Sequence, residues 1–364
     1  MTDVTLREVA RLSGCSVSTV SRVLSGNRPV GSETAGRVRA AAESLGYVPN
    51  QVARSLRSRS TGTVGLVLPQ IANPYYPALV RELTRALLAG GRAALLADCD
   101  DDSEAEAARV ADLLGRRVDA LLVIPVDEHR SRATVADAAA RVPLVLLDRG
   151  CGPQVADSVA VDHGVGIAMV MEHLAATGRR RPAFVGAAGN DSAAAERAAA
   201  YTAGLAHFPQ ADPGAVELGD FSVEWGRAAV DRLRPLRHDA VVCANDLIAI
   251  GVIQRLRERG ADVPGDVAVT GFDDIPMARL TVPALTTVRQ PVRELAAEAA
   301  ALLDRQLSGQ AGGARRSVRL TPELVVRAST VHPPVADAAL PTQHTPRAGS
   351  EADSGAHDPA KETQ

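Results

Sequence analysis

A polar stretch near the N-terminus carries the first side chains whose types and spacing suggest a chemistry. Ser16, Val17, Ser18, Ser21 and Arg22 remain on the side of a predicted helix that faces away from its apolar positions. An arginine guanidinium can donate two hydrogen bonds to guanine O6 and N7, and a valine can contact the thymine methyl group. The stretch therefore suggests a helix that contacts base edges in DNA.

A helix-turn-helix would position these side chains, because that motif presents its second helix to the major groove. The sequence predicts the second helix over residues 17–24, after a tight turn that contains Gly14. A third helix follows, which Ser32 could cap and which Gly46 stops. The apolar positions expected in its small core are Leu6, Val9, Ala10, Val20, Val23, Val38, Ala42 and Leu45. Periodicity alone leaves open a generic three-helix bundle with an exposed, arginine-rich surface.

Charge and hydroxyl side chains around this motif fit a polyanionic partner. The chain has a formal net charge of −3, yet its first 60 residues hold more arginines than acids, so the acidic excess lies in the remainder. Side chains suited to phosphates position a protein on DNA without specifying sequence. The candidates for this role are Thr5, Ser16, Thr19, Ser21, Asn27 and Ser32.

The sequence changes character after Gly62, where short apolar runs alternate with Ala- and Leu-rich amphipathic segments. This alternation predicts an α/β fold with parallel sheets flanked by helices, and runs without polar alternation predict strands buried on both faces. The number of strands over this length favours two lobes. The expected strands are Val64–Leu68, Ala93–Ala97, Ala120–Ile124, Leu144–Leu147, Ala183–Gly186, Ala240–Cys243 and Val267–Gly271.

Polar residues follow several of these runs, where parallel sheets bind ligands. Asp162, Asn245 and Asp273 each come directly after an apolar stretch, and a planar guanidinium such as that of Arg197 can grip a diol or a carboxylate. Tyr75 and Phe221 could stack on a ligand, and Gln290 could reach in from a connecting segment. Alternatives remain open: Asp162, Asn245 or Asp246 can cap helices, and the two aromatic residues can belong to the core.

Several ordered motifs together resemble the lactose/galactose repressor (LacI/GalR) family. The N-terminal motifs are residues 4–10, 14–24, 45–50 and 52–56. Those of the remainder, which extend the resemblance to about residue 330, are residues 63–67, 73–76, 119–123, 243–246, 249–251, 263–264, 267, 271–276 and 283–291.

This resemblance implies a domain organisation. We expect a helix-turn-helix domain over 1–49, a hinge helix and linker over 50–61, and a core over 62–332 similar to a periplasmic sugar-binding protein. Lobe 1 would comprise about 62–161 and 291–320, and lobe 2 about 162–290 and 321–332. Residues 333–364, which lack an apolar period, are expected to be disordered.

The resemblance also implies roles for individual residues. It places Asn50, Ala53, Arg54 and Leu56 at the DNA, with Leu56 wedged into the minor groove at the operator centre. It places Asp162, Arg197, Phe221, Asn245, Asp273 and Gln290 at the effector. The stretch 190–195 departs from the family in being rich in alanine, which leaves open a pocket smaller or less polar than a sugar cleft.

Other classes of protein fit less well. No nucleophile elbow, phosphate-binding loop or zinc-protease motif occurs, so we expect no enzyme, cofactor or metal; the acidic run at 98–102 fits a solvated loop. The separated cysteines suggest reduced thiols, and no apolar run predicts a membrane span or an export signal. A transport receptor would not explain the basic N-terminal region. An architectural DNA-binding protein with a vestigial pocket remains an alternative.

The expected partners are operator DNA, a small-molecule effector and a second copy of the chain, with a tetramer as the alternative to a dimer. Repression by a protein in the cytoplasm, on the nucleoid, is the function that the resemblance favours, and a sugar or sugar derivative is the expected effector.

Overall fold

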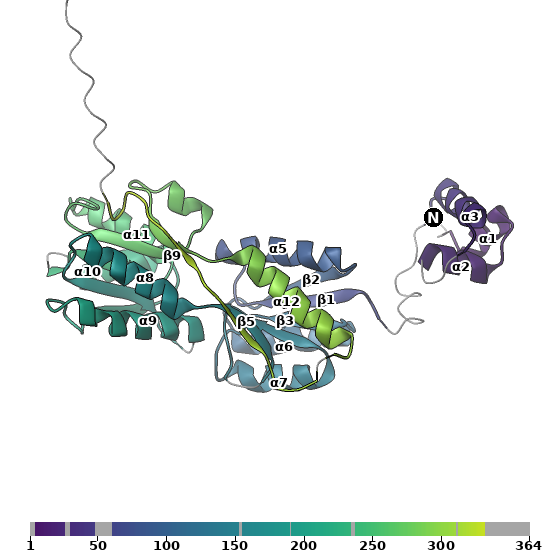
Figure 1. The fold of residues 1–364 in the computed structure, drawn as a ribbon, viewed down its shortest axis with the longest axis horizontal. Helices are drawn as coiled ribbons and strands as arrows, with labels where there is room; N and C mark the ends of the chain where they lie inside the picture. Colours follow the sequence, from purple (N-terminus) through teal and green to yellow (C-terminus); the bar gives the residue numbers. More distant parts are fainter. Residues whose placement is uncertain are drawn as a thin grey trace, which may run out of the picture.

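The computed structural model describes residues 4–25, 30–47, 60–152, 155–189, 191–233, 237–310 and 312–331. Within them lie a helical head and a core of two α/β lobes (Figure 1). Residues 50–59 of the expected hinge helix and linker lie outside the described residues, as do the tail over 333–364 and Asn27.

Three helices form the head: α1 (Leu6–Ser13), α2 (Val17–Ser25) and α3 (Ser32–Ser44). The Glu8 carboxylate accepts a hydrogen bond from the Thr5 backbone at 2.7 Å at the start of α1, and Gly14 ends that helix with a left-handed φ of 65°. Buried Val9, Val20 and Val38 form the core that the periodicity predicts, together with smaller side chains. Ser32, which the sequence suggests as a possible cap of α3, is instead its first helical residue, and Gly31 occupies the N-cap position.

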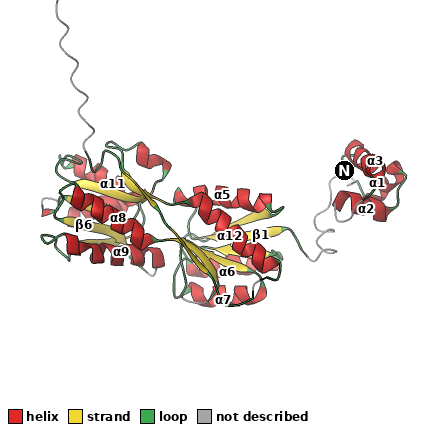
Figure 2. Cartoon of the chain, in the orientation of Figure 1, coloured by secondary structure: helices red, strands yellow, loops and turns green. Residues whose placement is uncertain are grey.

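The core contains two six-stranded sheets with helices on both faces (Figure 2). The elements of the first are β1 (Thr63–Leu68), α5 (Tyr75–Ala89), β2 (Ala93–Asp98), α6 (Ser103–Gly115), β3 (Ala120–Val123), α7 (Ser131–Arg141), β4 (Leu144–Leu147), β5 (Asp157–Val161), α12 (Val292–Leu307) and β11 (Ser317–Leu320). Those of the second are α8 (His163–Ala176), β6 (Pro182–Ala187), α9 (Ser192–Gly204), η1 (Leu205–His207), β7 (Val216–Gly219), α10 (Val223–Arg232), β8 (Ala240–Cys243), α11 (Asp246–Glu258), β9 (Ala268–Asp273), η3 (Pro276–Arg279), β10 (Thr286–Arg289) and β12 (Glu323–Val325).

The two sheets share one topology. Their strand orders are β11-β5-β4-β3-β1-β2 and β12-β10-β9-β8-β6-β7, and the chain passes between them after β5, after β10 and after β11. All pairings are parallel except β10 with β12, which is antiparallel. The fold therefore agrees with the α/β prediction, and both sheets direct the carboxyl ends of their central strands toward the junction between the lobes.

Burial separates the central strands from the edges. Strands β3, β4, β6 and β8 are buried throughout, as their unbroken apolar runs predict. The same prediction is wrong for β2, where Leu95 and Leu96 are 36% and 44% exposed. Strand β2 has a neighbour on one side only, because it ends the sheet. An apolar run identifies a strand but not its position in the sheet.

The cysteines and the acidic run are two smaller features of the structure. All four cysteines are free thiols. The acidic run at 98–102 lies between β2 and α6, where the Asp102 carboxylate caps the helix by accepting from the Glu104 backbone at 2.8 Å. Within the described ranges no cluster of His, Cys, Asp and Glu could hold a metal ion. No helix in those ranges is long and apolar enough to cross a bilayer.

Candidate functional site

A polar cleft lies where the two lobes meet. Twelve residues line it: Asn73, Tyr75, Tyr76, Asp148, Arg149, Asp191, Ala193, Arg197, Phe221, Asn245, Asp273 and Gln290. The first five belong to segments around β1, β4 and α5, and most of the others follow strands of the second sheet. The loops after the strands of both lobes thus converge on one small space, whose free volume is about 20 Å³.

Asp273 at the end of β9 is held in an unusual backbone conformation. Its φ is 108° and that of Asp274 is 52°, values that favour glycine. The Asp274 carboxylate compensates by accepting hydrogen bonds from Arg289 at 2.7 Å and Arg327 at 2.5 Å. These two guanidiniums therefore stabilise the backbone conformation that places Asp273 in the cleft.

Burial raises the pKa of Asp273 to about 7, although the nearby Arg197 guanidinium opposes this shift. Gln290 Nε2 donates to Asp273 Oδ1 at 2.8 Å, and Arg197 Nη2 lies 3.7 Å from the same oxygen. The other carboxylate oxygen, Asp273 Oδ2, receives no hydrogen bond from Gln290 or Arg197. Near neutral pH, Asp273 can thus be either an acceptor or a donor toward a ligand.

Arg197 on α9 is fixed from three sides. Its Nη1 donates to the Ala244 carbonyl at 2.7 Å, its Nε donates to His163 Nδ1 at 3.3 Å, and its guanidinium lies 3.8 Å from the Phe272 ring centroid. Burial, reinforced by Arg197, lowers the pKa of His163 well below its ordinary value, so the ring is neutral and can accept this bond. The guanidinium is consequently immobilised beside Asp273 before any ligand arrives.

An ion pair and a backbone hydrogen bond join the lobes directly across the cleft. Arg149 Nη2 in the first lobe lies 2.9 Å from Asp191 Oδ2 in the second, and both side chains are more than nine-tenths buried. Next to this pair, the Gly150 backbone donates to Ser192 Oγ at 2.8 Å. The cleft is therefore closed in this conformation, and a ligand larger than water requires the lobes to part.

The Tyr75 hydroxyl lies between the side chains of Gln290 and Asp148. It lies 3.0 Å from Gln290 Oε1 and 3.3 Å from Asp148 Oδ1. Burial raises the pKa of Asp148, while Arg197 and Arg149 oppose the shift. Asn245 Oδ1 accepts from the Ile248 backbone at 2.9 Å, which leaves its buried Nδ2 without an acceptor among the described residues. An unsatisfied buried donor favours a ligand that supplies an acceptor.

Six of the seven residues that the sequence predicts at the effector line this cleft: Tyr75, Arg197, Phe221, Asn245, Asp273 and Gln290. Asp162 is not among the lining residues, because its carboxylate caps α8 by accepting from the Val165 backbone at 2.9 Å. The suggestion that Asp246 caps a helix is wrong, because Asn245 is the N-cap of α11 and Asp246 instead accepts from the Thr287 hydroxyl and the Ile275 backbone.

Three charged residues that line the cleft, Asp148, Arg149 and Asp191, are not among the predicted effector contacts. The first two come directly after the buried strand β4, so the rule that found Asp273 would have found them. Asp191 lies within the alanine-rich stretch 190–195 and caps α9. Its pairing with Arg149 joins residues far apart in the sequence, which no local pattern could indicate.

The second candidate site is the exposed surface of α2 in the head. Ser16, Val17, Ser18 and Arg22 are exposed, with Thr5 at the start of α1; Thr19 and Ser21 are partly buried. Ser16 Oγ accepts from the Thr19 backbone at 3.1 Å and so caps α2. The other predicted DNA contacts, Asn27, Asn50, Ala53, Arg54 and Leu56, lie outside the described residues.

Comparisons with known proteins match both parts of the chain. Residues 5–50 match the family model of bacterial regulatory proteins, lacI family, and residues 171–330 match that of a periplasmic binding protein-like domain. The ribose operon repressor of Escherichia coli (strain K12) is 32% identical over 328 residues, covering 89% of this chain and 99% of the repressor.

Two solved structures extend the comparison. The Lac repressor dimer bound to operator and the anti-inducer ONPF matches with a TM-score of 0.80 at 27% identity, covering 91% of this chain and 100% of that one. A complex of the transcriptional regulator CelR with cellobiose matches with a TM-score of 0.67 at 32% identity, covering 90% and 99% of the two chains.

A helix-turn-helix head followed by a two-lobed core like a periplasmic binding protein defines a class of DNA-binding transcriptional regulators controlled by small molecules. The relatives named above are regulators of this kind and not enzymes. This chain belongs to the lacI family of bacterial regulatory proteins. The family, the fold class and the regulatory function that the sequence predicts are thereby confirmed.

Proposed function

We propose that this chain represses transcription from a two-fold operator, and that a small, uncharged polyol such as a monosaccharide binds in the cleft and changes its affinity for DNA. The observation that supports this effector class is the buried set of charges between the lobes. Asp148, Asp191 and Asp273 face Arg149 and Arg197 there. Ligand hydroxyls can donate to the carboxylates and accept from the guanidiniums at once.

The balance of these charges argues against an anionic effector. Three carboxylates stand against two guanidiniums, and each guanidinium is already occupied by an acidic partner or by backbone and ring groups. A phosphorylated sugar would place a further negative charge in this buried space without a free cation to receive it. Phe221 adds an apolar surface of the kind against which a sugar ring packs.

Ligand binding and DNA binding would be coupled through closure of the lobes. A ligand that bridges both lobes stabilises one relative position of them, and the head is attached to the first lobe at residue 60. Since coupling is reciprocal, operator DNA must alter effector affinity by the same factor as the effector alters operator affinity. We place this activity in the cytoplasm, on the nucleoid, where the operator lies.

A homodimer is supported by an apolar edge on the first lobe. Leu88 on α5 and Leu95 and Leu96 on β2 are 61%, 36% and 44% exposed, and α5 packs beside β2 (Figure 1). An unpaired edge strand with exposed leucines is a surface that a second copy can cover. Mass measurement in solution distinguishes a dimer from the tetramer that remains as the alternative.

The test is a thermal-shift screen of the full chain with neutral monosaccharides, their phosphates and purines, followed by operator-binding titrations with each stabilising compound. We expect a neutral sugar to raise the melting temperature and to change operator affinity. Stabilisation only by phosphorylated sugars or purines would contradict the proposed effector class. Operator binding that responds to none of these compounds would favour the architectural alternative, and no preference for its own promoter over random duplex would reject the regulator itself.

A further inference from the structure

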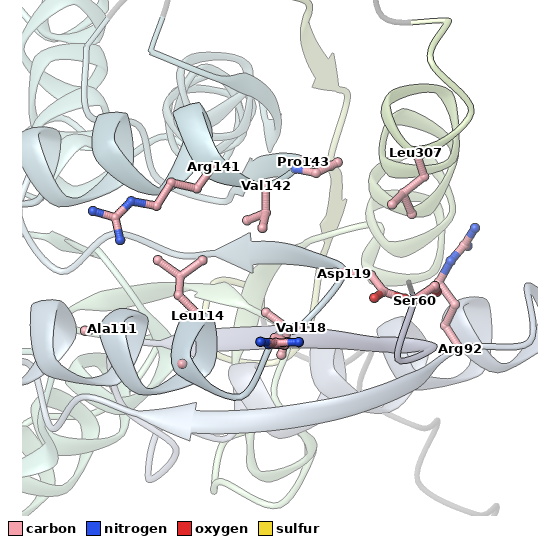
Figure 3. Close-up of a pocket in the computed structure, with 12 residues that line it drawn as sticks. Ser60, Arg92, Ala111, Leu114, Val118, Asp119, Arg141, Val142, Pro143 and Leu307 are labelled. Carbon is pink, nitrogen blue, oxygen red and sulfur yellow. Dashed lines mark hydrogen bonds between the residues drawn. The ribbon is translucent and has the colours of Figure 1, made fainter. Parts of the chain in front are cut away.

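A large cavity lies away from the cleft, at the opposite ends of the strands of the first lobe. It has a volume of about 840 Å³ and lies beside residue 60, where the described part of the core begins. Arg141 and Arg92 stand at its two ends, with Leu114 and Val142 between them (Figure 3). Its size suits a small organic molecule.

The lining of this cavity, hereafter the base pocket, is basic. Arg92, Arg117 and Arg141 contribute guanidiniums, and Asp119 contributes the one carboxylate among the lining residues. Partial burial raises the pKa of Asp119, but hydrogen bonds from Ser60 and the adjacent backbone outweigh this and hold the pKa below its usual value. The negative charge of Asp119 is therefore already compensated, and the excess of the pocket is positive.

The three guanidiniums are available to an anion. Arg92 is paired with Asp304, which is 52% exposed, and Arg141 lies 2.9 Å from Asp137, which is 61% exposed. Exposed pairs of this kind contribute little free energy, so an incoming anion can replace these carboxylates. The Arg117 side chain forms no hydrogen bond or ion pair within the described residues.

The backbone at Arg117 gives an independent reason to assign it a role. This residue follows α6 with a φ of 58°, in the left-handed position after a helix that glycine usually fills. An arginine there costs conformational energy that glycine would avoid, and such outliers gather at binding sites. The conformational cost at Arg117 therefore supports a binding role for its guanidinium.

We propose that the base pocket binds a phosphate-type anion and that this binding acts on the attachment of the head. The anion can come from a free phosphorylated metabolite or from the backbone of operator DNA. In either case it binds close to the Asp119 carboxylate, which accepts from Ser60 at 2.5 Å, from Thr61 at 2.7 Å and from Gly62 at 2.8 Å. These bonds hold the start of the core chain, so a bound anion next to them changes how the head is tethered.

The test compares the full chain with two variants. Arg117→Gly removes the guanidinium at a position that favours glycine, so the fold is expected to be kept, which a melting curve checks. Arg116→Ala is the matched control, because Arg116 is exposed, pairs with Asp112 and lies outside the pocket lining. We expect calorimetric titration with inorganic phosphate, against chloride at equal ionic strength, to show saturable binding that Arg117→Gly weakens at least tenfold and Arg116→Ala leaves unchanged.

The salt dependence of operator binding distinguishes the two sources of the anion. If DNA phosphates occupy the pocket, Arg117→Gly lowers the slope of log K against log salt by about one, and Arg116→Ala does not. If the ligand is a free anion, the slope is unchanged and phosphate shifts operator affinity in the parent chain but not in Arg117→Gly. Absence of saturable phosphate binding together with an unchanged slope would overturn the proposal, and so would equal phosphate binding by Arg117→Gly.

Discussion

The predicted DNA surface of the head and the cleft between the lobes place their polar side chains in opposite environments. On α2, Ser18 and Arg22 are exposed, and Arg22 Nε donates to the Ser18 carbonyl of its own helix at 3.3 Å. In the cleft, Arg197 and Asp273 are about 5% exposed and connected to several neighbours. An exposed side chain can be exchanged with little effect on its neighbours, whereas a change in a buried network affects every group in it.

The largest expected effect is that of Asp273→Ala on effector binding. This change removes the carboxylate that accepts from Gln290 and forms an ion pair with Arg197, and loss of one partner of a buried charged pair costs about 2–5 kcal/mol. We expect at least a thirtyfold loss of effector affinity, about the lower bound of that range, with operator binding kept. Calorimetry with the sugar identified in the screen measures it.

Asp162→Ala is the matched control for this variant. Asp162 also follows a strand, but its carboxylate caps α8 outside the cleft lining. It should cost about 1 kcal/mol of stability and leave effector affinity unchanged. A normal response of Asp273→Ala to the effector would remove Asp273 from the binding site.

A smaller effect is expected for Arg22→Ala on operator binding. Loss of a bidentate guanine contact costs about 1–3 kcal/mol and relaxes base preference at that position. Arg39→Ala, an exposed arginine on α3, serves for comparison, since any loss there should be equal for all sequences. Binding titrations against operator variants check this, and an unchanged footprint and preference for Arg22→Ala would exclude the base contact.

The two regions also differ in how far the sequence predicts them. The head follows from local periodicity, because Val9, Val20 and Val38 pack within one short segment. In the core, unbroken apolar runs locate the central strands, but edge strands such as β7 and β12 carry polar residues and escape this pattern. Position in a sheet depends on pairing between distant segments, which one sequence does not display.

The same limit applies inside the cleft. Asp273 and Asn245 are identified because each follows a strand, but that rule does not separate a ligand contact from a helix cap. Asp162 satisfies the rule and is a cap, whereas Asn245 both caps α11 and lines the cleft. The distinction depends on whether the strand ends at the junction of the lobes, which is a tertiary property.

The pH dependence of effector binding tests whether the buried carboxylate of Asp273 contacts the effector. With a pKa of about 7, Asp273 is mostly ionised at pH 8 and mostly protonated at pH 6. If ligand hydroxyls donate to the carboxylate, effector affinity should fall about tenfold between pH 8 and pH 6, in proportion to the ionised fraction. Operator affinity without effector should not follow this curve.

Asp273→Asn provides the control for this pH profile, because the amide keeps the shape of the side chain but does not titrate. We expect its weaker effector binding to be flat between pH 6 and pH 8. Asp148, whose pKa burial also raises, is the other buried acid beside Tyr75. A slope that persists in Asp273→Asn would assign the titration to Asp148.

The smallest expected effect comes from an exposed ion pair that also joins the lobes. Arg319 on β11 binds the Glu196 carboxylate on α9 through two hydrogen bonds of 2.8 Å, and the two side chains are 44% and 38% exposed. A pair of this kind contributes at most about 1 kcal/mol and is screened by salt. Glu196→Gln should therefore weaken effector binding less than fivefold, and the difference should shrink at high salt.

The buried ion pair between Arg149 and Asp191 spans the same junction and is the comparison for the exposed pair. Asp191→Asn keeps a residue able to cap α9 but leaves Arg149 unpaired in a buried site, so its cost should be severalfold larger and insensitive to salt. Calorimetric titration of both variants at low and high salt measures the contrast. If Glu196→Gln weakens effector binding as much as Asp191→Asn does, burial does not determine the strength of the contacts that close the lobes. The contrast between exposed and buried polar side chains would then not hold within the core.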